Sequence, residues 1–392
     1  MAKNIDCFID RTDSNAEKYT LRQELFGIED LIPMWVADMD LATPPFILEA
    51  IHQRLKHPIL GYEEFNKIAK KAQIDWLKTH HNLDFDIDQM IYSPSVVTSI
   101  NLIIQALTTE EDEIIVQPPV YFPFFKSVQN NNRKVVKNRL IYNNGLYRID
   151  FEHLESVITT KTKLLLLCSP HNPVGRVWSL DELSKLYHIC KKHNIIIFED
   201  AIHSDLVYKP NKFYSILQVD PKAKDITISA FGIGKTFNCA GINLSTLYIQ
   251  NESLRQIVKN HMNKIHLAQP NIVSSVAFET AYRQGSLWLQ ELLRHLENNM
   301  DYLYNCLKPY NHLICFQKPQ GTYLVWLDCN KMGLSNKQLR DFFIHQAKLG
   351  LNAGISFGKE GSGYMRINLA VDSKTLQKAC QQLTKALKKF RA

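Results

Sequence analysis

Three polar residues of different chemical type each come a few positions after a short apolar run. They are Asn172, Asp200 and Lys235. An amide, a carboxylate and an amine that meet in one crevice can bind a polar ligand, and a lysine amine can also bond to a carbonyl carbon. A lone lysine after a strand is usually a solvated loop residue, so the informative feature is the combination of the three.

The elements around these residues alternate between strands and helices. Apolar runs predict strands, and amphipathic stretches predict helices. The expected strands are 114–116, 164–168, 195–198 and 227–229, and the expected helices are 96–107 and 180–193. This alternation predicts an α/β fold with a mostly parallel sheet covered on both faces. Because ligands bind at the carboxyl ends of such strands, the three polar residues are expected to meet there.

The pattern changes after Pro270, where a helical region is expected to run to about Leu307. It is followed by expected strands at 313–316, 322–328 and 363–369, a helix at 336–349 and a C-terminal helix. We therefore expect a large domain over 46–288 and a smaller α+β domain built from 1–45 and 289–392. The boundary is expected inside the long helical region.

Composition narrows the class of protein. The chain has 392 residues, of which 45% are hydrophobic and 22% charged, as in an ordinary globular protein. The net charge is +7, but the basic residues form no stripe with aromatics, so no nucleic-acid partner is expected. No apolar run approaches the ~20 residues of a membrane span and no signal segment is evident, so we expect no membrane partner and a cytoplasmic location.

The eight cysteines predict neither disulfides nor a metal site. None stands in a C-x-x-C pair, and Cys168 and Cys190 lie inside apolar runs. We expect reduced thiols and no metal. The residues Gly234, Lys235 and Thr236 imitate the end of a P-loop, but that pattern needs a glycine at position 229, which is serine, so a nucleotide triphosphatase is not expected.

Longer motifs resemble those of a known family. They begin at Met34 (M-W-V-A-D-M-D), Gly61 (G-Y), Pro118 (P-P-V-Y), Ser169 (S-P-H-N-P-V-G-R-V-W), Lys235 (K-T-F-N), Gly321 (G-T-Y-L-V-W-L-D) and Gly363 (G-Y-M-R-I-N-L-A). From Arg11 nearly to its C-terminus, the chain resembles fold-type I pyridoxal 5'-phosphate (PLP) enzymes, which have the aspartate-aminotransferase-like PLP-transferase fold. Within them it resembles the MalY/PatB group of cystathionine β-lyases. The W-V-A-D-M-D segment favours this group over general aminotransferases.

The resemblance implies a homodimeric PLP enzyme that acts on a small amino acid. The expected reaction cleaves L-cystathionine or related S-substituted cysteines to a thiol, pyruvate and ammonia. A PLP-dependent aminotransferase is the main alternative, and a regulatory protein that keeps the fold to bind a partner is another. The sequence does not determine the substrate side chain.

The resemblance also implies roles for single residues. Lys235 would bond to the cofactor and, when released, remove the substrate Cα proton. Asp200 would pair with the pyridine nitrogen, and Asn172 would donate to the phenolic oxygen of the cofactor and contact the substrate. Tyr121 would stack on the ring, and Arg366 would bind the substrate carboxylate through two N–H groups.

Further contacts are implied around the cofactor phosphate and the substrate. The phosphate would lie at the start of the helix near Val96, where free N–H groups attract anions. The residues lining it would be Ser95, Val96 and Val97. Tyr62 would reach the phosphate from the neighbouring subunit, which places the active sites at a homodimer interface. Ala37 would lie beside the substrate and His203 near the ring, although a structural histidine is an equal alternative at position 203.

Four positions depart from the family pattern. Ala201 stands where these lyases usually have glutamate. Gly232 and Gly234 stand where small polar residues usually precede the lysine. Asn243 stands where many aminotransferases have a phosphate-binding arginine. The central residues are retained, so the departures bear on how the phosphate is held.

Overall fold

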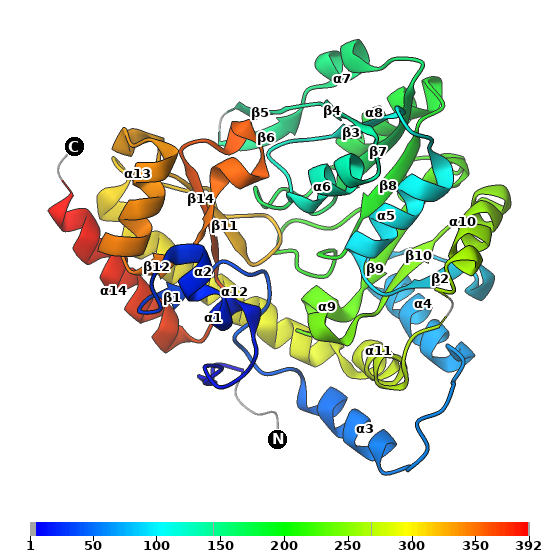
Figure 1. Cartoon of the computed structure of the whole chain (residues 1–392), viewed down its shortest axis with the longest axis horizontal. Coiled ribbons are helices and arrows are strands. Elements are labelled where there is room, and N and C mark those ends of the chain that lie inside the picture. The colour runs from blue at the N-terminus through cyan, green and yellow to red at the C-terminus, as the bar shows by residue number, and fades with distance from the viewer. Residues whose placement is uncertain (1–4, 144, 268, 391–392) are drawn as a thin grey trace.

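The computed structural model describes residues 5–143, 145–267 and 269–390, and a seven-stranded sheet runs through it (Figure 1). The strand order is β2-β10-β9-β8-β7-β3-β4. Strand β10 is antiparallel to both of its neighbours, and the other pairs are parallel. The strands are β2 (Met90–Ser93), β3 (Glu113–Val116), β4 (Lys134–Lys137), β7 (Thr162–Cys168), β8 (Ile196–Asp200), β9 (Thr227–Gly232) and β10 (Ser245–Tyr248). The predicted, mostly parallel sheet is confirmed.

The alternation of side chains along β7 and β8 explains why both faces of the sheet are covered. Successive side chains of a strand point to opposite faces. The four consecutive leucines 164–167 therefore pack alternately into two separate apolar clusters. The same period places Asp200 and Glu199 on opposite faces of β8. A change of register by one residue would exchange these two carboxyl groups.

Helices cover each face, as the strand–helix alternation predicted. One apolar cluster joins the sheet to α5 (Val96–Leu107), α6 (Pro123–Asn130) and α10 (Glu252–Lys264). The other joins it to α7 (Phe151–Val157) and α8 (Leu180–Lys192). A further group packs together beside the sheet and consists of α3 (Pro45–Leu55), α4 (Lys67–His81) and α11 (Ile272–Gln284). Among the described residues, no helix is long and apolar enough to cross a membrane.

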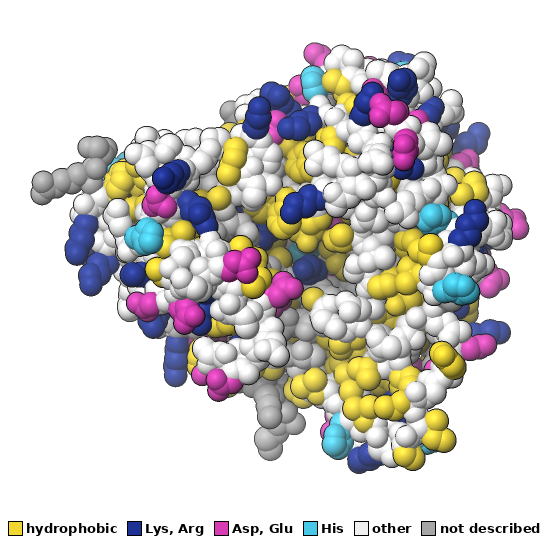
Figure 2. Space-filling view, viewed as in Figure 1, with side chains coloured by type: hydrophobic (Ala, Val, Ile, Leu, Met, Phe, Trp, Pro, Cys, Tyr) yellow, Lys and Arg dark blue, Asp and Glu magenta, His cyan; other side chains and the backbone are white. Residues whose placement is uncertain are grey.

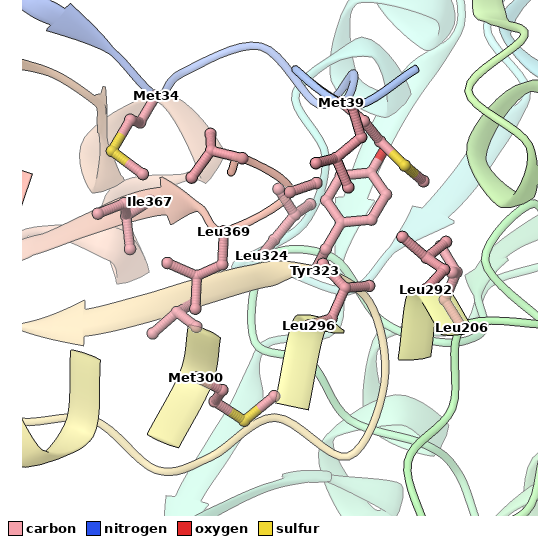
Figure 3. Close-up of a cluster of buried hydrophobic side chains, with 14 of the residues drawn as sticks. Met34, Met39, Leu206, Leu292, Leu296, Met300, Tyr323, Leu324, Ile367 and Leu369 are labelled. Carbon is pink, nitrogen blue, oxygen red and sulfur yellow. The ribbon is translucent and has the colours of Figure 1, made fainter. Parts of the chain in front are cut away.

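A smaller antiparallel sheet has the order β11-β14-β13. Its strands are β11 (Leu324–Asp328), β13 (Asn352–Ala353) and β14 (Tyr364–Asn368). Helix α12 (Ser286–Leu307) turns Leu292, Leu296 and Met300 toward it, and this i, i+4, i+8 spacing forms one helix face (Figure 3). Helix α14 (Ser373–Lys389) packs against α12.

The N-terminal part of the chain passes between the two sheets. After α1 (Glu17–Thr20) and α2 (Arg22–Phe26), strand β1 (Ile32–Pro33) pairs with β12 (Leu349–Gly350). The backbone then continues from the small sheet toward Asn238, whose side chain accepts a hydrogen bond from the N–H of Met39. A separate hairpin consists of β5 (Leu140–Asn143) and β6 (Leu146–Ile149). The division into domains 46–288 and 1–45 with 289–392 stays a prediction.

Two predictions in the last third of the chain were wrong in detail. Residues 313–316 form no strand, because only Cys315 pairs with β11, in an isolated bridge to Asp328. The predicted helix 336–349 is shorter, since α13 (Asn336–Asp341) passes into a π-helical turn, Phe342–Gln346. The chain must leave the helix there because Leu349 pairs with Ile32 in β12.

Candidate active site

A cavity of about 200 Å³ lies where β7, β8 and β9 reach their carboxyl ends. Most of the residues that the sequence predicted as site residues line it. They are Ala37, Ser95, Val96, Val97, Tyr121, Asn172, Asp200, His203 and Lys235. Parallel strands bring their carboxyl ends to one edge of the sheet, which explains why residues so far apart in the chain meet here.

Lys235 enters the cavity from the short helix α9 (Ile233–Thr236), directly after β9. Its Nζ donates a 2.7 Å hydrogen bond to the backbone carbonyl of Ala37. Burial, and then the nearby charge of Arg366, lower the pKa of Lys235 to about 8. With this pKa roughly one tenth of the amine is neutral at pH 7. The neutral amine is the nucleophilic and basic form.

Asp200 is the last residue of β8 and is buried at the cavity wall. Its Oδ1 accepts a 3.1 Å hydrogen bond from the N–H of Ile202. Burial raises the pKa of Asp200 to about 6, against the opposing effects of that hydrogen bond and of Lys235. A cation that bonded to this carboxylate would lower its pKa again, so the position suits a protonated ring nitrogen.

Arg366 on β14 and Asn172 after β7 form one hydrogen-bonded unit. Nη1 of Arg366 donates to Oδ1 of Asn172 at 3.0 Å, and Nη2 donates to the carbonyl of Trp35 at 2.7 Å and to Asn352 at 2.5 Å. Within the described chain no ion pair joins Arg366, and its Nε has no hydrogen-bond partner. Burial lowers the pKa of Arg366 to about 10. A buried cation held only by neutral acceptors is suited to an anionic ligand.

The start of α5 is shaped for an anion. Ser95 caps the helix, and its Oγ accepts a 3.1 Å hydrogen bond from the N–H of Thr98. The N–H groups of Val96 and Val97 have no acceptor within the helix, because the first turn lies beyond the reach of its own carbonyls. Both residues line the cavity. These amides and the helix dipole favour a phosphate at this end.

Tyr121 and His203 complete the lining near Asp200. Burial raises the pKa of Tyr121, and the tyrosine N–H donates to the carbonyl of Asn172 at 3.1 Å. Burial, followed by the charges of Lys235 and Arg366, holds the pKa of His203 well below its usual value. His203 is therefore neutral, and among the described residues nothing bonds to its Nδ1.

Two predicted residues, Arg366 and Tyr62, do not line the cavity. Arg366 bonds to the lining residue Asn172, whereas Tyr62 lies away from the cavity. Its side chain is fully exposed, in the segment between α3 and α4. Asn243, at the position where many aminotransferases have a phosphate-binding arginine, is exposed and does not line the cavity either. Within one subunit, neither Tyr62 nor Asn243 contributes to the site.

Sequence reasoning missed several lining residues. Pro94 and Ile202 lie next to predicted site residues in the sequence, and this position could have identified them as lining residues. Cys168 is the last residue of a predicted strand, which is a comparable signal. Cys239, Ala240 and Leu244, from the segment after α9, and Ser245, the first residue of β10, also line the cavity. Nothing in their local sequence indicated that position. No group of histidines, cysteines or carboxylates in the described ranges could hold a metal ion, and the eight cysteines are free thiols.

The chain is similar over nearly its whole length to several known proteins. Cystathionine beta-lyase PatB of Bacillus subtilis (strain 168) is 35% identical over 385 residues, which cover 98% of this chain and 100% of PatB. Cystalysin from Treponema denticola, whose crystal structure contains a pyridoxal 5'-phosphate cofactor, matches with a TM-score of 0.96 and 31% identity over 100% of both chains. A PLP-bound putative aminotransferase from Clostridium difficile 630 matches with a TM-score of 0.96 and 37% identity, over 98% of this chain and 99% of that one.

These likenesses confirm the predicted resemblance to the MalY/PatB group and the predicted PLP-transferase fold. The family model described as aminotransferase class I and II matches residues 29–383. Because that match spans most of the chain and the relatives align over nearly its whole length, the chain belongs to the aminotransferase class I and II family.

Proposed function

We propose that the chain is a PLP-dependent carbon–sulfur β-lyase that cleaves L-cystathionine or a related S-substituted cysteine to a thiol, pyruvate and ammonia. The observation that carries the proposal is the single cavity shared by Lys235, Asp200 and Asn172, in a chain that aligns with 100% of a cystathionine β-lyase. The PLP cofactor of cystalysin supports the same assignment.

The chemistry of the cavity wall fits PLP at three points. The α5 amides of Val96 and Val97 would bind the phosphate, at one side of the cavity. Asp200, a buried carboxylate with the N–H of Ile202 as its hydrogen-bond donor, would pair with the protonated pyridine nitrogen. The amine of Lys235 would hold the aldehyde carbon covalently.

When bound, PLP supplies an electron sink that stabilises negative charge at the substrate Cα. The side chains would set up that chemistry. Asp200 would keep the proton on the ring nitrogen, and Tyr121 would cover one ring face. Lys235, once free, would take the proton from Cα, for which a pKa of about 8 is well matched.

Arg366 and Asn172 would bind and orient the substrate. The guanidinium would hold the α-carboxylate, and Asn172 would keep Arg366 aligned while its own amide donates to the ligand. Ala37, which lines the cavity, would lie beside the bound substrate. Orientation of this kind places the Cα–H bond toward the Lys235 amine.

The β-lyase reaction breaks the substrate Cβ–S bond after Cα loses its proton. The sulfur leaves as a thiolate, and water releases pyruvate and ammonia. An aminotransferase is the second candidate, favoured by the name of the matching family and by the Clostridium difficile relative. An aminotransferase would leave the Cβ–S bond intact and transfer the amino group, and it needs a keto acid to turn over.

The decisive experiment incubates purified protein with PLP and L-cystathionine without a keto acid, and measures pyruvate and free thiol. A β-lyase forms both in equal amounts, and Lys235→Ala forms neither and loses the visible absorption of covalently bound cofactor. A parallel incubation contains an added keto acid. Pyruvate that appears only in that parallel sample, or brisk amino transfer without thiol release, would establish the aminotransferase.

We also infer a homodimer in the cytoplasm. Tyr62 is exposed beside apolar side chains that also face solvent, namely Leu48, Leu55, Ile59, Leu60 and Ile68. Figure 2 shows hydrophobic side chains gathered on this part of the surface, near α3. Burial of such a patch against a second subunit would remove it from water and could bring Tyr62 to the partner's phosphate site. The eight free thiols agree with a reducing compartment.

A further inference from the structure

Tyr323 and Lys235 bond to the same oxygen atom. The hydroxyl of Tyr323 donates to the carbonyl of Ala37 at 2.8 Å, and Nζ of Lys235 donates to it at 2.7 Å. Tyr323 precedes β11 and is buried, and Figure 3 shows its hydroxyl turned toward the segment that carries Met39. Its side chain does not line the cavity, so it reaches the site only through this carbonyl.

The segment that carries Ala37 is held at every carbonyl from Met34 to Met39. Asn368 donates its backbone N–H to the carbonyl of Met34 and its side-chain amide to the carbonyls of Val36 and Asp38. The side chain of Arg366 donates to the carbonyl of Trp35, and that of Lys18 donates to the carbonyl of Asp38. The side chains of Asn238 and Arg11 donate to the carbonyl of Met39. These donors come from several distant elements. The carbonyl of Ala37 therefore has a fixed direction, and the donors to it must adapt to its position.

We propose that Tyr323 is a positioning residue that sets, through the shared carbonyl of Ala37, both the direction of the free Lys235 amine and its tendency to hold a proton. The inference rests on the proposed role of Lys235 as the residue that binds PLP and takes the substrate proton. It adds that the amine has a built resting site whenever it is not bonded to another group.

Two donors on one carbonyl compete for the same partial negative charge. A carbonyl oxygen has two lone pairs, and Tyr323 occupies one of them. The remaining lone pair is a weaker acceptor than it would be alone, so it stabilises a lysine ammonium less. Hydrogen bonding to the charged form raises an amine's pKa, and a weaker bond raises it less. The hydroxyl of Tyr323 therefore keeps more of Lys235 neutral.

Other charges around Lys235 act on it through space. The basic groups Arg366 and Lys18 favour its neutral form, and the carboxylates of Asp38 and Asp200 favour its charged form. His203 is neutral, and Tyr121 and Tyr323 are protonated because burial raises the pKa of each. Tyr323→Phe removes one hydroxyl, keeps the ring and leaves all the other groups unchanged.

The test uses the full chain freed of cofactor, with trace acetic anhydride as the probe of neutral amines. Acetylation of Lys235 is measured by mass spectrometry from about pH 6 to about pH 10, relative to the exposed Lys161. We expect a midpoint near 8 in the wild type. In Tyr323→Phe the midpoint should rise by roughly half a unit, as the loss of one neutral hydrogen bond predicts.

Tyr208→Phe is the matched control. Tyr208 is also buried, and its hydroxyl donates to a backbone carbonyl, that of Thr322, at 2.7 Å. This variant should leave the Lys235 midpoint unchanged. An unchanged or lower midpoint in Tyr323→Phe, or an equal shift in both variants, would overturn the proposal.

Site-specific 3-fluorotyrosine at position 323 provides a second measurement if Tyr323→Phe folds poorly. Its hydroxyl is a stronger donor, so the midpoint should fall instead, and a rise would contradict the proposal. The labelling needs neither PLP nor substrate. If the wild type forms no pyruvate yet the midpoints shift as expected, the proposed reaction fails while the positioning role stands.

Discussion

Nη1 of Arg366 donates to Oδ1 of Asn172 at 3.0 Å, which connects the small sheet to the loop after β7 of the large sheet. The two residues are 194 positions apart in the chain. The group proposed to bind the substrate carboxylate is thus joined to the loop proposed to contact the cofactor ring by one direct hydrogen bond. A change in the packing of the two sheets against each other would move one group relative to the other.

Arg366→Lys should lower kcat/KM for the amino-acid substrate roughly 100-fold, which corresponds to about 3 kcal/mol. A lysine cannot donate two parallel bonds to a carboxylate or reach Asn172 and Trp35 together. Most of the loss should appear in KM, and cofactor absorption should remain. Steady-state kinetics measure it, with the exposed Arg283→Lys as control. An unchanged KM would remove Arg366 from the substrate site.

Asp200→Asn should stabilise the cofactor-free protein at neutral pH. The folded pKa of about 6 lies above the ordinary 3.8, so the folded state binds a proton that the unfolded state releases between about pH 4 and 6. Stability therefore falls as pH rises through this window and is lower above it, by on the order of 2–3 kcal/mol. Asp200→Asn should lack this fall.

Urea unfolding at pH 4.5 and 7.5 measures the effect, with the exposed Asp13→Asn as control. Saturating PLP should reverse the order at pH 7.5, because only the carboxylate pairs with a protonated ring nitrogen. If the stability of the wild type and of Asp200→Asn depended equally on pH without cofactor, burial would not raise the pKa of Asp200 in the folded protein.

Gly232→Ser and Gly234→Ser should have opposite effects on PLP retention. A Cβ at Gly232 would lie 3.0 Å from Ile202 and 3.1 Å from Ser245, so it would push the β9 end away and should hasten PLP dissociation. At Gly234 the nearest atom, of Ala240, is 3.4 Å away, and the residue lines the cavity. A hydroxyl there has room to bind phosphate and should slow dissociation.

The rates are measured by dilution of the PLP-loaded protein into apo-acceptor, followed by absorbance. If both variants slow dissociation, the missing hydroxyl matters at each position and the tight packing at Gly232 does not. If both accelerate it, close approach of the backbone governs the phosphate end.

Tyr62→Phe should release PLP faster, although Tyr62 is fully exposed in a single chain. One lost hydrogen bond to a charged group is worth roughly 1.5–3 kcal/mol, or about tenfold or more in affinity. Tyr142→Phe, at another exposed tyrosine, should have no effect. Light scattering should show a dimer for all three proteins.

Mixed dimers of Tyr62→Phe and Lys235→Ala give a sharper result. In such a hybrid the subunit that retains Lys235 receives an intact Tyr62 from its partner, so one site should regain wild-type PLP affinity. Absence of this recovery, or unchanged affinity in Tyr62→Phe alone, would reject the contribution across subunits.

The sequence by itself determined those parts of the site that depend on local order. Asn172, Asp200 and Lys235 each follow a strand of one mostly parallel sheet, and such strands end at one edge whatever the details of packing. The anion-binding start of α5 was equally local, because a capping serine before an apolar helix can be recognised from a few residues.

Only the tertiary structure shows which distant segments contact each other when no sequence motif or hydrophobic periodicity links them. Tyr323 meets Ala37 across 286 positions and Lys235 meets it across 198, and no local pattern encodes a common acceptor at such separations. The same holds for the close packing around Gly232 and for the residues between 239 and 245 that line the cavity. These contacts follow from how the two sheets and the segment between them pack, because side-chain packing is set by the whole core.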